Sequence, residues 1–109
     1  ALGNLCESVC GVRPVAYEKT PLSASDPVAM DEEMQSGLLA AAHARGVSAM
    51  RMISGAGHDA ASFAPICPTA MVFIPCKDGV SHNKLEFTTP EAVCTGAEVI
   101  LAYLRGCAQ

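Results

Sequence analysis

Two histidines, each in a glycine-containing turn next to an apolar segment, are the residues of this sequence best placed to do chemistry. His58 stands in the run SGAGHDA at residues 54–60, and His82 stands in the run GVSHN at residues 79–83. Turns positioned by a rigid scaffold carry a large share of catalytic and binding side chains. The two turns are therefore the predicted site, either as a metal ligand beside a substrate contact or as ordinary polar loop residues.

Three other readings of these residues fit less well. The first turn matches the dinucleotide-binding outline G-x-G-x-x-A, but that fingerprint needs a full crossover helix, and Pro65 and Pro68 would end the helix almost at once. A serine hydrolase is disfavoured because SGAG is not G-x-S-x-G and because Ser81, adjacent to His82 along the chain, does not have triad geometry. A zinc finger is disfavoured because the cysteines and histidines lack paired ligand spacing.

Composition excludes several classes of partner. The chain has 109 residues, of which 50% are hydrophobic, so it is one domain or a piece of one. Its net charge of −4, with only 7 basic residues, gives no footprint for nucleic acid or an anionic membrane. Apolar runs such as residues 70–74 are far shorter than the roughly 20 residues of a membrane span. The first eleven residues also lack the basic region of a signal peptide.

The six cysteines lie mostly in apolar segments and none belongs to a C-x-x-C pair. Free, reduced cysteines that act as small hydrophobic residues fit this pattern better than a secreted disulfide framework does. We therefore expect an intracellular, cytoplasmic location.

Apolar periodicity and capping residues predict an α/β layer whose sheet edges present the two turns. Asp31 is the expected N-cap of one helix, and Thr89 followed by Pro90 begins another. The expected elements are a strand at 9–20, a linker at 19–27 with a boundary near 25, a helix at 31–45, a strand at 47–53, a short helix at 58–63, a strand at 69–74 and a helix at 89–105. The last helix carries one apolar face, which consists of Val93, Ala97, Ile100, Leu101 and Leu104. His43, in the last turn of its helix, is interpreted as structural.

Several of these motifs together resemble a known family. The run SGAGHDA, the block PTAMVFIPCKDGVSHN at 68–83, Glu86 and the run TPE at 89–91 are similar to the C-terminal segment of the metal-dependent amidohydrolases related to aminoacylases and dimetal carboxypeptidases. Within that superfamily the sequence resembles the hydantoinase/carbamoylase branch, which comprises N-carbamoyl-L-amino acid hydrolase, beta-ureidopropionase and allantoate amidohydrolase. The resemblance covers residues 10–105, and residues 51–91 are its most specific part.

For the fold, the resemblance implies a C-terminal part of a two-layer or three-layer α/β catalytic domain with a mixed sheet flanked by helices. Residues 1–25 would be the last strand of a lid and dimerisation domain with the hinge, and residues 26–109 would belong to the catalytic domain. The full-length enzyme would be a homodimer with two divalent ions, Zn, Mn, Co or Ni, to which this chain supplies at most one ligand.

For the site, the resemblance implies that His82 is a metal ligand. It also implies that His58, with the Gly57 backbone beside it, is a catalytic and substrate-binding group that contacts the substrate or stabilises the developing oxyanion. Asp59 could orient His58 or cap the short helix, and capping is favoured. Ser81 and Asn83 could hold the His82 ring or simply form the turn, and Glu86 is interpreted as structural.

The implied activity is metal-assisted hydrolysis of the carbamoyl C–N bond of N-carbamoyl-L-amino acids or related ureido acids. The family's other metal ligands and its general-base glutamate have no counterpart in these 109 residues. We therefore expect the isolated chain to be inactive and to be a fragment, a truncated product or one part of a longer enzyme. The alternative is a non-catalytic interaction or assembly module derived from the same fold.

Overall fold

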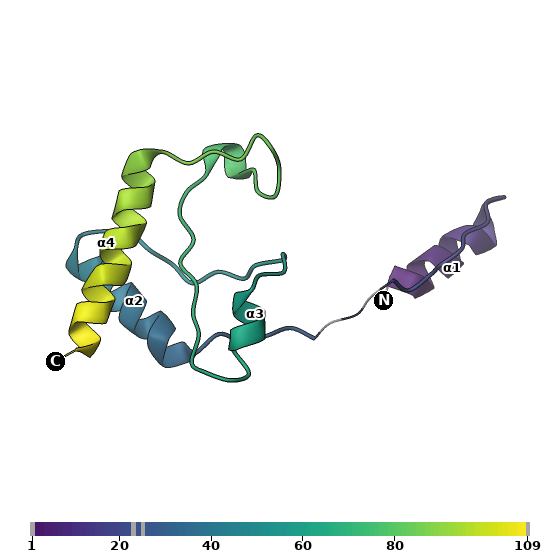
Figure 1. The fold of residues 1–109 in the computed structure, drawn as a ribbon. Coiled ribbons are helices and arrows are strands. Elements are labelled where there is room, and N and C mark those ends of the chain that lie inside the picture. The colour runs from purple at the N-terminus through teal and green to yellow at the C-terminus, as the bar shows by residue number, and fades with distance from the viewer. Residues whose placement is uncertain (1, 23, 25, 109) are drawn as a thin grey trace.

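The computed structural model of the protein describes residues 2–22, 24 and 26–108 (Figure 1). Its elements, in chain order, are α1 (Leu2–Val12), α2 (Glu32–Ala44), α3 (Ala60–Phe63), the short 3-10 helix η1 (Lys77–Gly79) and α4 (Pro90–Cys107). Helices α2 and α4 lie against each other, whereas α1 lies apart from them (Figure 1). No β-strand forms within the described residues, so the predicted mixed sheet is not observed there.

Helix α2 begins and ends at the residues that the sequence predicts. The Asp31 side chain accepts a hydrogen bond from the Met34 backbone N–H at 2.8 Å, which satisfies one of the unpaired donors of the first turn. At the other end Gly46 adopts a left-handed φ of 70° and donates to the His43 carbonyl at 2.9 Å. The predicted helix is confirmed.

Helix α4 also begins as predicted, because the Thr89 hydroxyl accepts from the Ala92 backbone N–H at 3.3 Å and Pro90 occupies the first helical position. The apolar face that periodicity predicts does form, but the structure leaves it exposed. Its residues are Val93, Ala97, Ile100, Leu101 and Leu104. A second face makes the contacts instead, with Gly96 and Val99 buried. Helix α4 is therefore apolar on two faces, and one of them is open.

Two glycines allow close approach around the helix pair. A Cβ atom added to Gly37 on α2 would lie 2.5 Å from the Tyr103 ring, and one added to Gly96 would lie 2.6 Å from Ile74 Cγ2. Both distances are far below van der Waals contact, so only a residue without a side chain fits at these two positions. An ion pair between Arg45 and Glu98 joins the two helices at their exposed edge, where such pairs contribute little to stability.

The segments predicted as strands at 47–53 and 69–74 run without a β-ladder. A strand satisfies its backbone N–H and C=O groups only when a neighbouring strand pairs with it. The start of the second segment is instead held by the Thr69 carbonyl, which accepts from the Asp31 N–H at 2.9 Å. Both segments expose large apolar side chains, which include Met50, Met52, Ile53, Val72 and Phe73.

The N-terminal prediction is wrong for residues 9–12, because these residues belong to helix α1 rather than to a strand. The chain beyond α1 folds back along it, since the Lys19 ammonium lies 3.7 Å from a Cβ built at Gly3. The last strand of a lid domain is therefore not observed in the described part of residues 1–25. Ser23 and Ser25, and with them the predicted boundary, lie outside the described residues.

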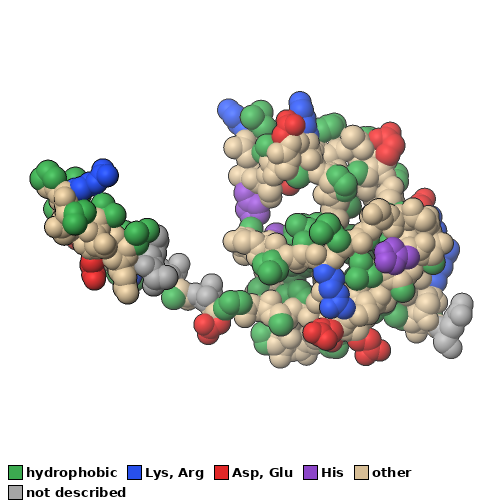
Figure 2. All heavy atoms as spheres, turned by 180° about the vertical axis from the view of Figure 1, so that it is seen from behind, with side chains coloured by type: hydrophobic (Ala, Val, Ile, Leu, Met, Phe, Trp, Pro, Cys, Tyr) green, Lys and Arg blue, Asp and Glu red, His purple; other side chains and the backbone are tan. Residues whose placement is uncertain are grey.

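Little apolar surface is buried within the described residues. Ala42 and Val99 are the buried hydrophobic side chains there. The Cα radius of gyration is 19.6 Å, whereas a compact domain of this length has about 13 Å. Figure 2 shows hydrophobic side chains over much of the surface and a hollow in the body of the molecule. Among the described helices, none has the length and apolar character needed to cross a membrane.

Candidate functional site

The two histidine turns lie together in the structure. The ring centroids of His58 and His82 are 6.1 Å apart and the ring planes meet at 74°. The edge of a third ring, that of Phe73, lies close by, with its centroid 5.4 Å from that of His58. Residues 24 positions apart in the sequence are thus brought side by side, as expected of neighbouring turns.

The first turn holds His58 through a serine that the sequence reasoning did not single out. Ser54 Oγ lies 2.8 Å from His58 Nε2 and also accepts from the Ala56 backbone N–H at 3.2 Å. His58 is half-buried. Serine side chains often bond the backbone two residues on, and the glycines at 55 and 57 let the chain turn back onto that hydroxyl. The spacing Ser-x-x-x-His across two glycines is the feature of the sequence that could have predicted this contact.

Asp59 does not play the role that the sequence favours. It stands at the N-cap position of α3 with helical backbone angles, φ −57° and ψ −28°, and its side chain makes no capping bond. A capping side chain normally needs an extended backbone at that position. The first turn of α3 is closed instead by backbone bonds, such as that from the Ala61 N–H to the His58 carbonyl at 3.0 Å.

The second turn presents His82 on an unusual backbone. His82 has a left-handed φ of 55°, and its backbone N–H donates to Glu86 Oε2 at 3.0 Å. Asn83 Oδ1 accepts from the Leu85 N–H at 3.0 Å. Glu86 and Asn83 therefore build the turn, which agrees with the structural interpretation of Glu86. The His82 side chain is exposed.

The loop that carries His82 is closed at its base. The Lys77 N–H donates to the Phe87 carbonyl at 2.7 Å, and the Thr88 hydroxyl donates to the Pro75 carbonyl at 2.6 Å. A hollow of about 420 Å³ lies beside this base. It is lined by Pro75, Cys76, Lys77, Phe87, Thr88, Thr89 and Ala92. Neither histidine lines this hollow, so it is separate from the pair of turns.

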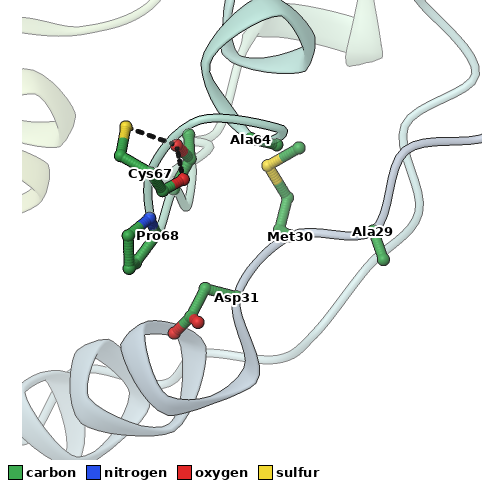
Figure 3. A pocket seen from close by; sticks show the side chains of 7 residues that line it. Ala29, Met30, Asp31, Ala64, Cys67 and Pro68 are labelled. Atoms are coloured by element: carbon green, nitrogen blue, oxygen red, sulfur yellow. Dashed lines mark hydrogen bonds between the residues drawn. The ribbon is translucent and has the colours of Figure 1, made fainter.

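A separate hollow of about 240 Å³ lies at the start of α2, and Figure 3 shows the side chains that line it. Ala29, Met30, Asp31, Ala64, Cys67, Pro68 and Thr69 line it. Cys67 Sγ lies 3.6 Å from Thr69 Oγ1, and the Asp31 carboxylate caps α2. The polar groups of this hollow are thus engaged in local structure.

His43 and the cysteines stand outside the pair of turns. His43 is exposed in the last turn of α2, where its carbonyl helps to end the helix. The six cysteines are free. Three of them, Cys67, Cys94 and Cys107, are exposed, which differs from the burial expected of small hydrophobic residues.

The residues present offer only part of a metal site. Within the described ranges no group of three or more histidine, cysteine, aspartate or glutamate side chains could hold a metal ion. His82 and His58 supply two imidazoles, whereas protein sites for divalent zinc use at least three side chains. The described residues alone do not make a complete metal site.

Comparison with known proteins identifies the family. The model of peptidase family M20/M25/M40 matches residues 3–106. An uncharacterized hydrolase of Haemophilus influenzae is 41% identical over 88 residues, which are 81% of this chain and 21% of that protein. The N-carbamoyl-L-amino-acid amidohydrolase of Rhizobium meliloti is 41% identical over 100 residues, 89% of this chain and 22% of that protein.

The allantoate amidohydrolase of Bacillus subtilis is 33% identical over 99 residues, 88% of this chain and 23% of that protein. The chain thus spans less than a quarter of the length of these relatives. The Rhizobium meliloti and Bacillus subtilis relatives carry the names of the branch that the motifs around His58 and His82 resemble. The chain belongs to peptidase family M20/M25/M40, in its carbamoylase branch.

Proposed function

We propose that this chain is the C-terminal part of an α/β amidohydrolase that hydrolyses the carbamoyl C–N bond of N-carbamoyl-L-amino acids or related ureido acids. The observation that carries the proposal is the approach of the His58 and His82 rings to 6.1 Å. The names of the matched amidohydrolases support the substrate class. Small molecules that carry a ureido group are the expected substrates.

His82 is the proposed metal ligand. Its turn is fixed through the backbone N–H, which donates to Glu86, so that bond leaves the imidazole nitrogens free. A neutral imidazole suits Zn, Mn, Co or Ni alike. When bound, a pair of such ions supplies Lewis-acid chemistry at the scissile carbonyl. The work of this chain is to hold the His82 ring beside the first turn.

His58 and the Gly57 backbone are proposed to bind the substrate. The His58 ring is fixed on one side by Ser54 and lies against Phe73, so it is oriented before a ligand arrives. A preorganised donor stabilises charge that develops on a carbonyl oxygen without further reorganisation. Gly57 has open space around its Cα, which leaves room for a substrate to approach the backbone.

The remaining ligands and the sheet are proposed to come from the rest of a longer polypeptide. Support comes from the open apolar face of α4, with residues such as Ile100 and Leu104, and from the unpaired extended segments at 47–53 and 69–74. Contiguous apolar surface of this kind marks a face that packs against further protein. The segments would join a mixed sheet, residues 1–25 would lead out of a lid domain, and the full-length enzyme would be a homodimer.

A chimera tests this proposal. Residues 3–106 replace the matching segment of the Rhizobium meliloti amidohydrolase, and hydrolysis of an N-carbamoyl-L-amino acid is measured with added Mn²⁺, Co²⁺, Ni²⁺ or Zn²⁺. We expect a folded, active chimera that His82→Ala inactivates by more than about 100-fold, because even outer-shell partners of ligands cost 10–100-fold. The 109-residue chain alone should show no hydrolysis.

His43→Ala is the matched control, since it removes an exposed imidazole away from the two turns and should leave the rate within about twofold. A folded chimera that binds no metal and turns over no substrate would contradict the proposal and favour a non-catalytic assembly module. Turnover by the isolated chain would contradict the proposed division of the site.

A further inference from the structure

The Ser54 hydroxyl has one proton and three neighbours that compete for hydrogen bonds with its oxygen. Oγ accepts from the Ala56 N–H at 3.2 Å, lies 2.8 Å from His58 Nε2, and lies 3.5 Å from the Ala56 carbonyl oxygen. A serine hydroxyl offers one donor and two acceptor positions. The Ala56 N–H uses one acceptor position. The direction of the hydroxyl proton then decides whether Oγ donates to His58 Nε2 or to the Ala56 carbonyl.

The distances favour His58 Nε2 as the acceptor. An O–H donor bonds best to acceptors at 2.5–3.0 Å, a range that includes Nε2 and excludes the Ala56 carbonyl. If Nε2 carried a proton, the acceptor left for the hydroxyl among the described protein groups would be that carbonyl, at 3.5 Å. When the hydroxyl donates to Nε2, both contacts of Ser54 within normal distance are complete and the hydroxyl proton is used as well.

We infer that Ser54 holds neutral His58 in the tautomer that carries its proton on Nδ1. Which ring nitrogen of a histidine is protonated is set by the hydrogen bond that the other one makes. With Nε2 accepting from Ser54, Nδ1–H is the donor that remains for a ligand. Within the described residues Nδ1 has no hydrogen-bond partner. Ser54 is therefore a positioning residue, and it acts through His58.

The tautomer defines what His58 can contact. A ring whose Nε2 is occupied and whose Nδ1 carries a proton donates a hydrogen bond and does not coordinate a metal. Its partner is an oxygen, such as that of a carbonyl or carboxylate group. Under the proposed function, on which this last step rests, that oxygen is the one on which negative charge develops during C–N hydrolysis. The His82 ring makes no such bond to Ser54, and His82 stays the proposed metal ligand.

The tautomer can be read directly in the 109-residue chain. Long-range ¹H–¹⁵N spectra of the labelled chain are recorded at pH about 8.5, two units above the pKa of about 6.5 that a free imidazole has. The three histidines are assigned with single variants. We expect His58 to show a protonated Nδ1 and an unprotonated Nε2. A protonated Nε2, alone or together with Nδ1, overturns the inference without any serine variant.

Three serine variants separate positioning from a general structural effect. Ser54→Ala should give His58 a mixture of tautomers, and Ser54→Thr, which keeps the hydroxyl, should restore the Nδ1–H form. Ser81→Ala, which removes a hydroxyl beside His82, should leave the His58 signals unchanged. Circular dichroism checks that the helices persist. Identical His58 spectra for wild type and a folded Ser54→Ala variant would overturn the inference.

The active chimera then distinguishes this inference from the proposed function. There Ser54→Ala should lower kcat by about tenfold, an effect at the lower end of that found when outer-shell partners of metal ligands are removed, with KM changed less. If the chimera is inactive while the Nδ1–H tautomer is found, the proposed function fails and the inference stands. If kcat is unchanged in Ser54→Ala, the catalytic part of the inference fails.

Discussion

The helix pair α2–α4 and the two histidine turns are held by different kinds of interaction. The pair is held by side-chain packing between residues distant in sequence, as in the contact of Gly37 with Tyr103. Each histidine is held in its turn by hydrogen bonds within four residues, as between Ser54 and His58 or between Glu86 and His82. Packing responds to volume, whereas these bonds respond to the loss of one donor or acceptor. Stability and site geometry should therefore be separable by mutation.

The largest effect should come from adding one methyl group to the packed side of α4. Gly96→Ala places a Cβ atom 2.6 Å from Ile74 Cγ2, whereas Gly106→Ala on the same helix meets nothing within 4 Å. Overpacking costs about 1–3 kcal/mol, and replacing a helical glycine by alanine gains up to about 1 kcal/mol. Gly96→Ala should lower the free energy of unfolding and Gly106→Ala should raise it, as measured by thermal and urea melts of the helical signal.

The two substitutions are expected to change the free energy of unfolding in opposite directions. If both variants stabilise the chain, Ile74 gives way easily and the contact at Gly96 is not a packing constraint. The His58 and His82 signals in NMR spectra serve as the second readout. They should stay unchanged in Gly106→Ala, because that position lies beyond the described contacts of both turns.

A smaller and local effect should follow from Glu86→Ala. The Glu86 carboxylate accepts from the His82 N–H at 3.0 Å in an exposed turn. A hydrogen bond of this kind contributes about 1 kcal/mol, so exchange of the His82 amide proton should quicken about fivefold. The melting of α2 and α4 should not change, because surface substitutions away from packed contacts stay within about 0.5 kcal/mol.

Glu86→Gln is the matched control, since its amide oxygen can still accept the bond from His82. Exchange in Glu86→Gln should stay closer to wild type than in Glu86→Ala. Equal exchange rates in the two variants would show that the turn is fixed by its backbone bonds alone, such as that from the Glu86 N–H to the Asn83 carbonyl.

The parts of the fold that the sequence predicted are those encoded by neighbouring residues. The caps Asp31 and Thr89 marked the starts of α2 and α4, because a capping side chain bonds a backbone N–H within three residues. The strands at 47–53 and 69–74 were not confirmed, because a ladder depends on a partner strand that no local pattern supplies. Helix α1 was missed although Leu5, Cys6 and Val9 recur at helical spacing, because the alternation that begins at Val9 was interpreted as a strand.

In the site, too, some features could be predicted from neighbouring residues and others could not. That His58 and His82 lie on neighbouring turns was predicted and is confirmed by their 6.1 Å separation. Their roles toward metal and substrate stay predictions. Ser54 was missed because its bond to His58 depends on how two glycines turn the chain. The choice of the contacting face of α4 could not be predicted either, because both faces are apolar and the rest of the chain decides between them.

The smallest effect concerns Tyr103, whose ring lies over Gly37 in the helix contact. A hydrogen bond with the Cys107 thiol raises the pKa of Tyr103 above its ordinary value, and desolvation and the negative charges of nearby groups, among them Glu33, add to the shift. A raised pKa in the folded state means that the folded chain holds the phenol proton more tightly than the unfolded chain. The stability linked to it is present below the ordinary pKa of about 10 and is lost as pH rises through the folded-state value.

Titration of the phenolate absorbance in a Tyr17→Phe background checks this, since Tyr103 is then the one tyrosine left. Cys107→Ala should move the Tyr103 pKa back toward its ordinary value, while the site histidines keep their tautomers. Because the Tyr103 ring also reports on the helix contact, Gly37→Ala, whose Cβ would lie 2.5 Å from that ring, should shift its titration in the same direction by separating α4 from α2. A Tyr103 pKa that is unchanged in Gly37→Ala but falls in Cys107→Ala would show that the shift arises within α4 itself and not from the contact with α2.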